Sequence, residues 1–191
     1  MDLTSFLIYC TIATFTLGPT NIVILSTVNN YGPKKALKYS YGATIGFGIL
    51  LVLSATLNTM LITIIPKILI VMQIIGSAYM LYLAYQISKT DTSNPTVKQS
   101  ATFKSGLLMQ FLNPKVVLFT MTVIPTFIIP QYSAAFAVTI SIFIITLIGF
   151  LAFITWVLFG TIFKAFIQKH NKMVNGMMAL FLIYASIMIW I

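Results

Sequence analysis

A lysine lies inside an apolar stretch that has the composition of a membrane span. Lys115 follows Asn113 and Pro114 in the run FLNPKVVLF, residues 111–119. A cation at bilayer depth costs about 2.5–3.5 kcal/mol, and a proline in a helix interior costs about 3 kcal/mol. Ionisable residues within a membrane usually belong to substrate or ion pathways. The three residues therefore predict a site in the membrane interior where Lys115 binds an anion.

Gly18, Pro19, Thr20 and Asn21 interrupt the first apolar stretch in a similar way. Glycine commonly ends a helix and proline commonly begins one, so we expect a helix to stop at Gly18 and restart at Pro19. Asparagine is a preferred N-cap, so the Asn-Pro pair ahead of Lys115 predicts a second restart. Each restart turns free N–H groups and a partial positive charge toward the membrane centre. Together with the lysine they predict a dry, positive pocket for an anion, most simply a carboxylate.

Both breaks are expected at the same depth. Pro19 and Pro114 each lie about nine residues from the cytoplasmic end of their apolar stretch, which is roughly 13 Å along a helix. A second arrangement stays open for the later break. In it, Phe103–Leu112 forms a re-entrant segment, the remaining span shrinks to about 16 residues, and Lys115 extends to the lipid headgroups.

These breaks must be held by a bundle of membrane-spanning helices. The chain has 191 residues, of which 59% are hydrophobic, and a hydrocarbon core of about 30 Å needs roughly 20 apolar residues per helix. We expect an all-α membrane protein with a single transmembrane domain over residues 1–191. The six expected spans are Leu3–Val28, Ser40–Ile62, Ile68–Ile87, Gly106–Ile129, Ser133–Phe159 and Met173–Ile191.

The positive charge follows the connections between these spans. The formal net charge is +9, but its distribution fits membrane topology, so we expect no nucleic-acid partner. Lysines concentrate in cytoplasmic loops, which places the first, third and fifth connections in the cytoplasm and both termini outside. The second connection holds only Lys67. The basic connections contain Lys34, Lys35 and Lys38; Lys89, Lys98 and Lys104; and Lys164, Lys169 and Lys172.

A polar stretch divides the chain into two halves of three spans each. We expect a cytoplasmic linker at residues 89–104 between half-repeats 1–88 and 105–191. An odd number of spans gives the halves opposite orientations, which is the layout of inverted repeats in secondary transporters. The first helix of each half is then broken, at Pro19 and at Pro114.

Few residues remain for other kinds of chemistry. Cys10 is the only cysteine, His170 is the only histidine, and the two carboxylates, Asp2 and Asp91, lie outside the expected spans. These numbers argue against a metal site, thiol–disulfide exchange and intramembrane hydrolysis, so we expect neither an enzyme nor a cofactor. A scaffold without transport leaves both helix breaks without a purpose. Efflux of another small molecule, such as a toxic cation or drug, stays open as the alternative.

Five segments share an order and a spacing that are specific in combination. They are TLGPTNIVILS at 16–26, the Tyr31–Gly32 turn with Gly42 and Gly46 after it, GSAYMLYL at 76–83, FKSG at 103–106 and FLNPK at 111–115. In these segments the chain resembles the LysE/RhtB family of bacterial amino-acid exporters. The family often has Pro-Gly-Pro followed by Asn or Asp, whereas Leu17 and Thr20 stand here, a difference that bears on substrate choice more than on fold.

The resemblance implies export of amino acids or related metabolites across the bacterial inner membrane, driven by the proton-motive force. We expect alternating access, with the substrate carboxylate held between Pro19–Asn21 and Asn113–Lys115. Because the expected spans contain no carboxylate, Lys115 is the one intramembrane candidate for coupling to protons, neutral in one state and charged in the other. Glycine-rich helix faces permit a homodimer.

Overall fold

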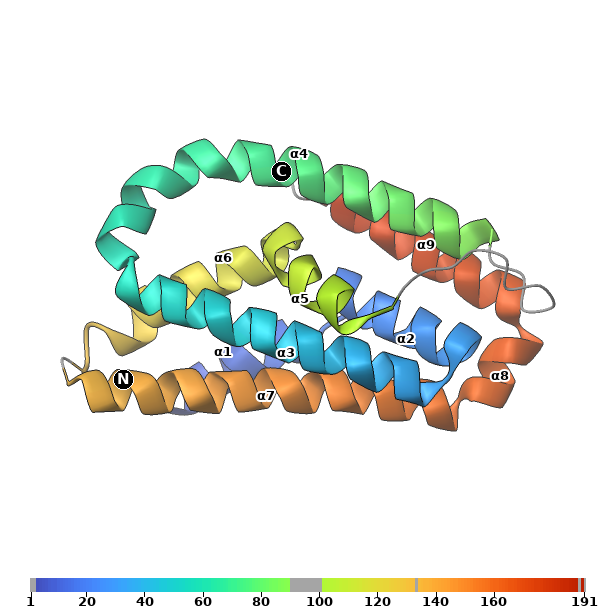
Figure 1. Cartoon of the computed structure of the whole chain (residues 1–191), viewed down its shortest axis with the longest axis horizontal. Coiled ribbons are helices and arrows are strands. Elements are labelled where there is room, and N and C mark those ends of the chain that lie inside the picture. The colour runs from blue at the N-terminus through green and yellow to red at the C-terminus, as the bar shows by residue number, and fades with distance from the viewer. Residues whose placement is uncertain (1–2, 90–100, 133, 189, 191) are drawn as a thin grey trace.

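The protein is helical throughout the residues that the structure describes. The computed structural model describes all residues except 1–2, 90–100, 133, 189 and 191 (Figure 1). None of the described residues forms a strand, which confirms the all-α prediction. The elements are α1 (Leu3–Phe15), α2 (Pro19–Tyr31), α3 (Pro33–Thr56), α4 (Asn58–Lys89), α5 (Phe103–Leu112), α6 (Pro114–Val123), the π-helical turn η1 (Ile124–Ile128), α7 (Ala135–Ile162), α8 (Lys164–Lys169) and α9 (Asn171–Met188).

Two pairs of helices are bent where the sequence predicts breaks. α1 and α2 meet at 48°, and α5 meets the segment of α6 and η1 at 68°. Pro19 is the first residue of α2, and Pro114 is the first residue of α6. Each bent pair has the length and hydropathy of one membrane span, as do α3 and α7 singly. The described residues therefore contain two straight candidate spans, or up to four when each bent pair counts as one.

The connection after α3 lies earlier than the hydropathy of the sequence suggests. The prediction of a loop at residues 63–67 is wrong, because α3 ends at Thr56 and α4 begins at Asn58. The backbone of Lys67 therefore belongs to α4. At the end of α3 the hydroxyl of Thr56 donates to the carbonyl oxygen of Val52 at 2.9 Å.

Glycines allow α3 and α5 to pack with their backbones in contact. A Cβ atom on Gly42 would lie 1.9 Å from the carbonyl oxygen of Phe103, and one on Gly106 would lie 2.1 Å from that of Tyr39. Gly46 is similarly close to the backbone of α5. Gly42 and Gly46 thus serve the close packing of α3 against α5. The contact fixes α5, and with it the second helix break, against the middle of the bundle (Figure 1).

α2 is an enclosed helix at the centre of the site. All residues from Pro19 to Asn29 are buried, and the helix packs mainly against α3 and α7. Its polar side chains therefore contact protein rather than the surroundings of the bundle. Polar groups within membranes usually face the interior of a bundle in this way.

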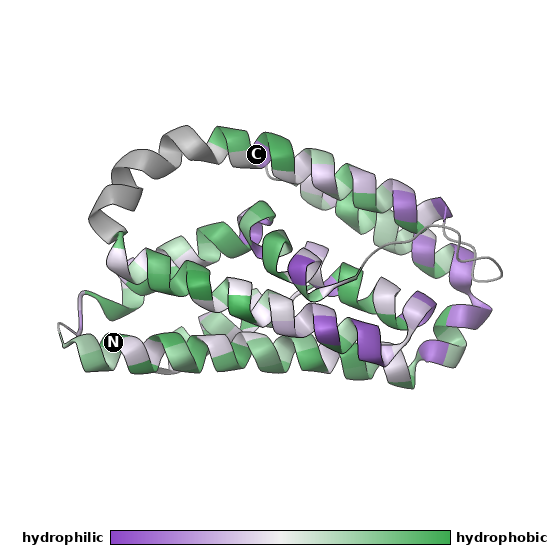
Figure 2. Cartoon of the chain, viewed as in Figure 1, coloured by the Kyte–Doolittle hydropathy of each residue, from purple (hydrophilic) through white to green (hydrophobic). Residues whose placement is uncertain are grey.

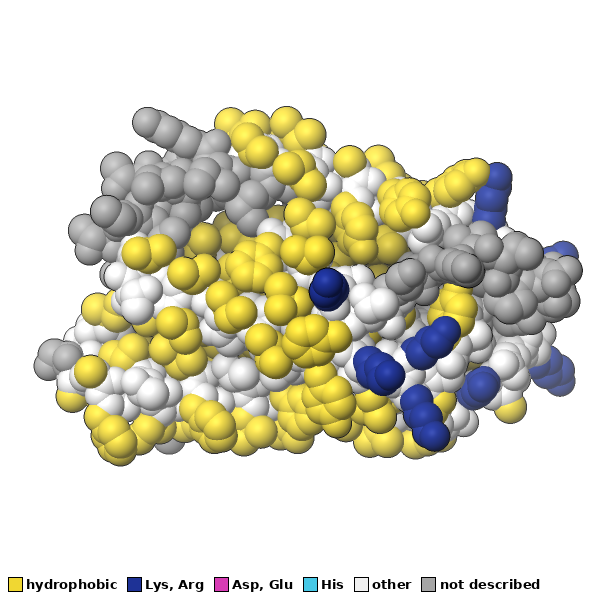
Figure 3. All heavy atoms as spheres, in the orientation of Figure 1, with side chains coloured by type: hydrophobic (Ala, Val, Ile, Leu, Met, Phe, Trp, Pro, Cys, Tyr) yellow, Lys and Arg dark blue, Asp and Glu magenta, His cyan; other side chains and the backbone are white. Residues whose placement is uncertain are grey.

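Hydrophilic residues and lysines gather at one end of the molecule. Figure 2 shows this end as mostly hydrophilic, whereas the rest of the bundle is mostly apolar. Most lysines visible in Figure 3 lie there, around the α2–α3 connection and α8. Of the predicted linker 89–104, residues 90–100 lie outside the described residues. The described lysines other than Lys67 and Lys115 are Lys34, Lys35, Lys38, Lys89, Lys104, Lys164, Lys169 and Lys172.

Candidate functional site

The two helix breaks meet through the side chain of Thr20. The amide nitrogen of Asn113 donates to Thr20 Oγ1 at 3.1 Å, and the amide nitrogen of Gln110 donates to the same oxygen at 3.3 Å. Thr20 belongs to the first turn of α2, whereas Gln110 and Asn113 belong to the end of α5 and the start of α6. Segments about 90 residues apart in sequence therefore form one site.

Asn113 occupies the predicted position but makes a different bond. Its backbone is extended and precedes Pro114, so it is the N-cap residue of α6 as predicted. The side chain does not cap the helix, because its amide group is turned to Thr20 instead. Gly18, the N-cap residue of α2, has no side chain that could cap the helix. The first turns of both helices therefore keep N–H groups that no capping side chain occupies.

The first helix ends before the glycine where we expected it to stop. α1 ends at Phe15, three residues ahead of Gly18, because side chains bind its last carbonyl oxygens. The amide nitrogen of Asn21 donates to Thr14 O at 3.3 Å and to Thr16 O at 2.9 Å. The indole N–H of Trp156 donates to Phe15 O at 3.2 Å. The terminal carbonyls of α1 are thus satisfied inside the protein.

Lys115 lies against this same helix end. Its ammonium group donates to Thr16 Oγ1 at 2.7 Å and to Thr16 O at 3.3 Å. The C-terminus of a helix carries a partial negative charge, which favours a cation there. Lys115 is partly buried, and two of the three N–H donors of an ammonium group are accounted for. A third donor is left for another acceptor.

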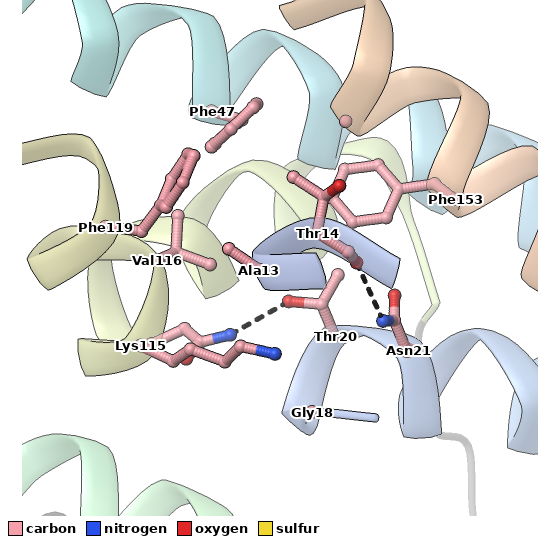
Figure 4. A pocket seen from close by; sticks show the side chains of 12 residues that line it. Ala13, Thr14, Gly18, Thr20, Asn21, Phe47, Lys115, Val116, Phe119 and Phe153 are labelled. Carbon is pink, nitrogen blue, oxygen red and sulfur yellow. Dashed lines mark hydrogen bonds between the residues drawn. The ribbon is translucent and has the colours of Figure 1, made fainter. Parts of the chain in front are cut away.

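A small cavity lies between the two breaks. Its volume is about 40 Å³, and Figure 4 shows Thr14, Thr20, Asn21 and Lys115 around it, with phenylalanine rings on the opposite side. Lys115 is the one ionisable residue among those that line it. The lining residues are Ala13, Thr14, Gly18, Thr20, Asn21, Phe47, Asn113, Lys115, Val116, Phe119, Gly149 and Phe153.

A larger and mostly apolar cavity adjoins the small one. Its volume is about 510 Å³, and it shares Gly18, Asn113 and Lys115 with the small cavity. These three residues therefore lie at the boundary between the two spaces. The other residues that line the large cavity are Leu17, Pro19, Ile22, Gln73, Met80, Pro114, Leu118, Phe181, Tyr184, Ala185 and Met188.

Two amide oxygens at the small cavity have no hydrogen-bond donor. The side chains of Asn21 and Asn113 are 4% and 2% exposed, and the Oδ1 atom of each is buried and unpaired. A buried polar atom usually has a partner. The combination of two acceptors, one ammonium group and two uncapped helix starts suits a ligand that has both a hydrogen-bond donor and a negatively charged group.

The structure brings all the predicted site residues together. Gly18, Pro19, Thr20, Asn21, Asn113, Pro114 and Lys115 each line at least one of the two cavities. Their role in binding stays a prediction. Within the described residues, no three His, Cys, Asp or Glu side chains lie close enough to hold a metal ion.

Sequence reasoning missed several residues of the site. Thr16 precedes the Gly-Pro break, and its position at a helix end could have marked it as a partner for a cation. Gln110 is a polar residue in an apolar run, which is a similar signal. Nothing in the sequence distinguishes Phe47, Phe119 and Phe153 from the other phenylalanines, because only packing brings their rings to the cavity.

Comparison with known proteins gives a consistent result. The sequence profile of the family described as LysE type translocator matches residues 11–191. A cysteine/O-acetylserine efflux protein of Klebsiella pneumoniae subsp. pneumoniae is 32% identical over 98% of this chain and 96% of its own length. A protein of the same name from Escherichia coli O139:H28 is 29% identical over 98% of this chain and 97% of its own length. No solved structure gives a significant match.

Proposed function

This chain belongs to the LysE type translocator family, and on that premise we propose that it exports small amino acids across the bacterial inner membrane. The relatives are named for the efflux of cysteine and O-acetylserine. Both compounds are small, polar amino acids with a free carboxylate. We propose substrates of this size and charge for this chain.

One observation supports this proposal most strongly: Lys115 lies at the boundary of both cavities, inside the bundle. No other ionisable residue is among those that line the small cavity. Its ammonium group keeps one donor beyond the two used by Thr16. A substrate carboxylate placed here would also face the uncapped starts of α2 and α6. The proposed binding residues are Gly18, Pro19, Thr20, Asn21, Asn113, Pro114 and Lys115.

The way in which the halves meet is compatible with alternating access. Thr20 lies in the first half, and its hydroxyl oxygen binds Gln110 and Asn113 of the second half. These are neutral hydrogen bonds, each worth about 0.5–1.5 kcal/mol, so a rocking motion can break and remake them. We propose that the halves rock about this contact. In this scheme Lys115 couples transport to the proton-motive force by changing its protonation between the two states.

We propose six spans arranged as two inverted repeats, with half-repeats 1–88 and 105–191. The bent pairs α1–α2 and α5–α6 support the proposal, because each half begins with a broken helix. The lysine-rich end would face the cytoplasm and both termini the outside. A homodimer within the lipid bilayer belongs to the same proposal.

The export of amino acids can be tested in bacterial cells preloaded with a panel of dipeptides. We expect cells that express the chain to release small polar amino acids, cysteine among them, faster than cells with an empty vector. An uncoupler should remove the difference. If the chain is present in the membrane and release is unchanged across the panel, the proposal is wrong. Faster export of a cationic drug instead would favour the alternative function.

A further inference from the structure

We propose that the small cavity is a subsite for the α-ammonium group of the substrate. In this subsite the ammonium group donates hydrogen bonds to Asn21 Oδ1 and Asn113 Oδ1. This inference rests on the proposed function and narrows its substrate class. It predicts that the transporter recognises the zwitterionic head group of an amino acid. A monocarboxylate or a simple amine would then be a poor substrate.

The orientation of the Asn21 amide group follows from its partners. The nitrogen faces the carbonyl oxygens of Thr14 and Thr16, which can only accept hydrogen bonds. If the amide group were flipped, Asn21 Oδ1 would face these two carbonyl oxygens, and no hydrogen bond could form. Oδ1 is therefore held on the other side of the group, where it is buried without a donor. Figure 4 shows this oxygen turned toward the ring of Phe153.

Asn113 carries a second unpaired acceptor. Its amide nitrogen is directed at Thr20 Oγ1 at 3.1 Å, which leaves Oδ1 buried and unpaired. Asn21 and Asn113 come from different helix breaks, yet both line the small cavity. Two unpaired acceptors on residues that line one cavity match a group that has several donors, such as an ammonium group.

The aromatic walls of the small cavity also favour a cation, on the side of the cavity away from the Lys115 ammonium group. The rings of Phe47, Phe119 and Phe153 line it, and the first two stack with centroids 5.9 Å apart. The face of an aromatic ring attracts an ammonium group. A volume of about 40 Å³ holds a head group of a few heavy atoms, since one water needs about 10–15 Å³ on this measure. A whole amino acid does not fit.

The rest of the substrate has room in the adjoining cavity. Gly18, Asn113 and Lys115 line both spaces. The substrate carboxylate must therefore lie next to Lys115, between the lysine ammonium group and the ammonium group of the substrate, because two like charges repel each other. The side chain then extends into the large cavity of about 510 Å³. Its walls are mostly apolar, which sets little restriction on a small side chain.

The test uses the purified protein in proteoliposomes and three compounds that differ by one group. L-cysteine carries both groups, 3-mercaptopropionate lacks the ammonium group, and cysteamine lacks the carboxylate. We expect unlabelled cysteine to inhibit the transport of labelled cysteine at concentrations at least about tenfold below either analogue, because each lacks a charge-assisted contact. Inhibition by 3-mercaptopropionate as strong as that by cysteine would overturn the ammonium subsite and leave amino-acid export standing. Absence of cysteine transport, together with absence of transport of other small amino acids, would overturn both.

Three variants test whether Asn113 causes the preference for cysteine over 3-mercaptopropionate. Asn113→Leu removes the acceptor, so we expect the preference for cysteine over 3-mercaptopropionate to fall by about tenfold. Gln110→Leu loses a similar bond to Thr20 but does not line either cavity, so the preference should persist. Asn113→Asp keeps an acceptor, and the Thr20 hydroxyl can donate to it, so this variant should also retain the preference. An unchanged preference in Asn113→Leu would overturn the assignment.

Discussion

At the scale of single residues, the two asparagines of the site differ in what their amide nitrogens satisfy. Asn21 donates to two backbone carbonyls at the end of α1, which need donors because the helix supplies none there. Asn113 donates to the hydroxyl of Thr20, which also accepts a bond from Gln110. Asn21 therefore contributes to holding the break, whereas Asn113 is more replaceable for stability.

This difference predicts unequal losses of stability for two otherwise matched substitutions. Asn21→Leu should lower the free energy of unfolding by about 2–3 kcal/mol, and Asn113→Leu by about 1 kcal/mol, because the first removes two bonds to carbonyls and the second removes one to a hydroxyl. Thermal unfolding of the detergent-purified variants measures both. Equal unfolding midpoints would contradict the assigned role of Asn21.

At the scale of the elements, the position of the second break depends on how α5 packs. α5 is only a short helix, yet its backbone touches α3 at Gly42 and Gly106. Such close approach is typical of small residues at helix contacts in membranes. Any side chain added at these contacts must move α5, and the N-terminus of α6 moves with it.

The glycine contacts give a prediction with an internal control. Gly106→Ala would place a Cβ atom 2.1 Å from the carbonyl oxygen of Tyr39, so we expect a loss of about 1–3 kcal/mol in stability and a loss of transport. Gly176→Ala meets nothing within 4 Å and should be neutral or stabilise by about 0.5–1 kcal/mol. Unfolding midpoints and transport rates of the two variants provide the comparison. Similar unfolding midpoints and transport rates for the two variants would contradict the prediction, because they would show that α3 and α5 can separate to accommodate the added methyl group at little cost.

The sequence predicted the two breaks well because proline and glycine act locally. Pro19 and Pro114 each begin a helix, as expected from their fixed backbone angle and missing N–H. The partners of the broken ends were not predictable, because Thr16 and Trp156 reach them only through the tertiary fold. The turn at Leu57 was misplaced because apolar residues continue past it on both sides.

At the scale of the whole molecule, charge and hydropathy together define its two ends. Lysines gather around the α2–α3 connection and α8 (Figure 3), whereas the sequence that connects η1 with α7 contains none. In a membrane this asymmetry favours one orientation. The sequence predicted this arrangement because topology depends on the order of the loops, which does not require side-chain packing.

The orientation can be tested by labelling single cysteines with a membrane-impermeant maleimide. Cys10 is the only native cysteine and is buried, so a Cys10→Ala background provides a silent reference. Lys169 and Gln131 are exposed at opposite ends. We expect Gln131→Cys to react in intact cells and Lys169→Cys to react only after permeabilisation. The reverse pattern would invert the proposed topology.

The central claim is that a carboxylate substrate binds Lys115 within the bundle, and amino-acid counterflow in proteoliposomes tests it most directly. Three proteins are compared: the native chain, Lys115→Gln, and Lys104→Gln, which removes an equal charge from an exposed position on α5. We predict native rates for Lys104→Gln and a decrease of about tenfold or more for Lys115→Gln, because a charge-assisted hydrogen bond to the carboxylate is lost. Counterflow at the native rate in Lys115→Gln would contradict the account.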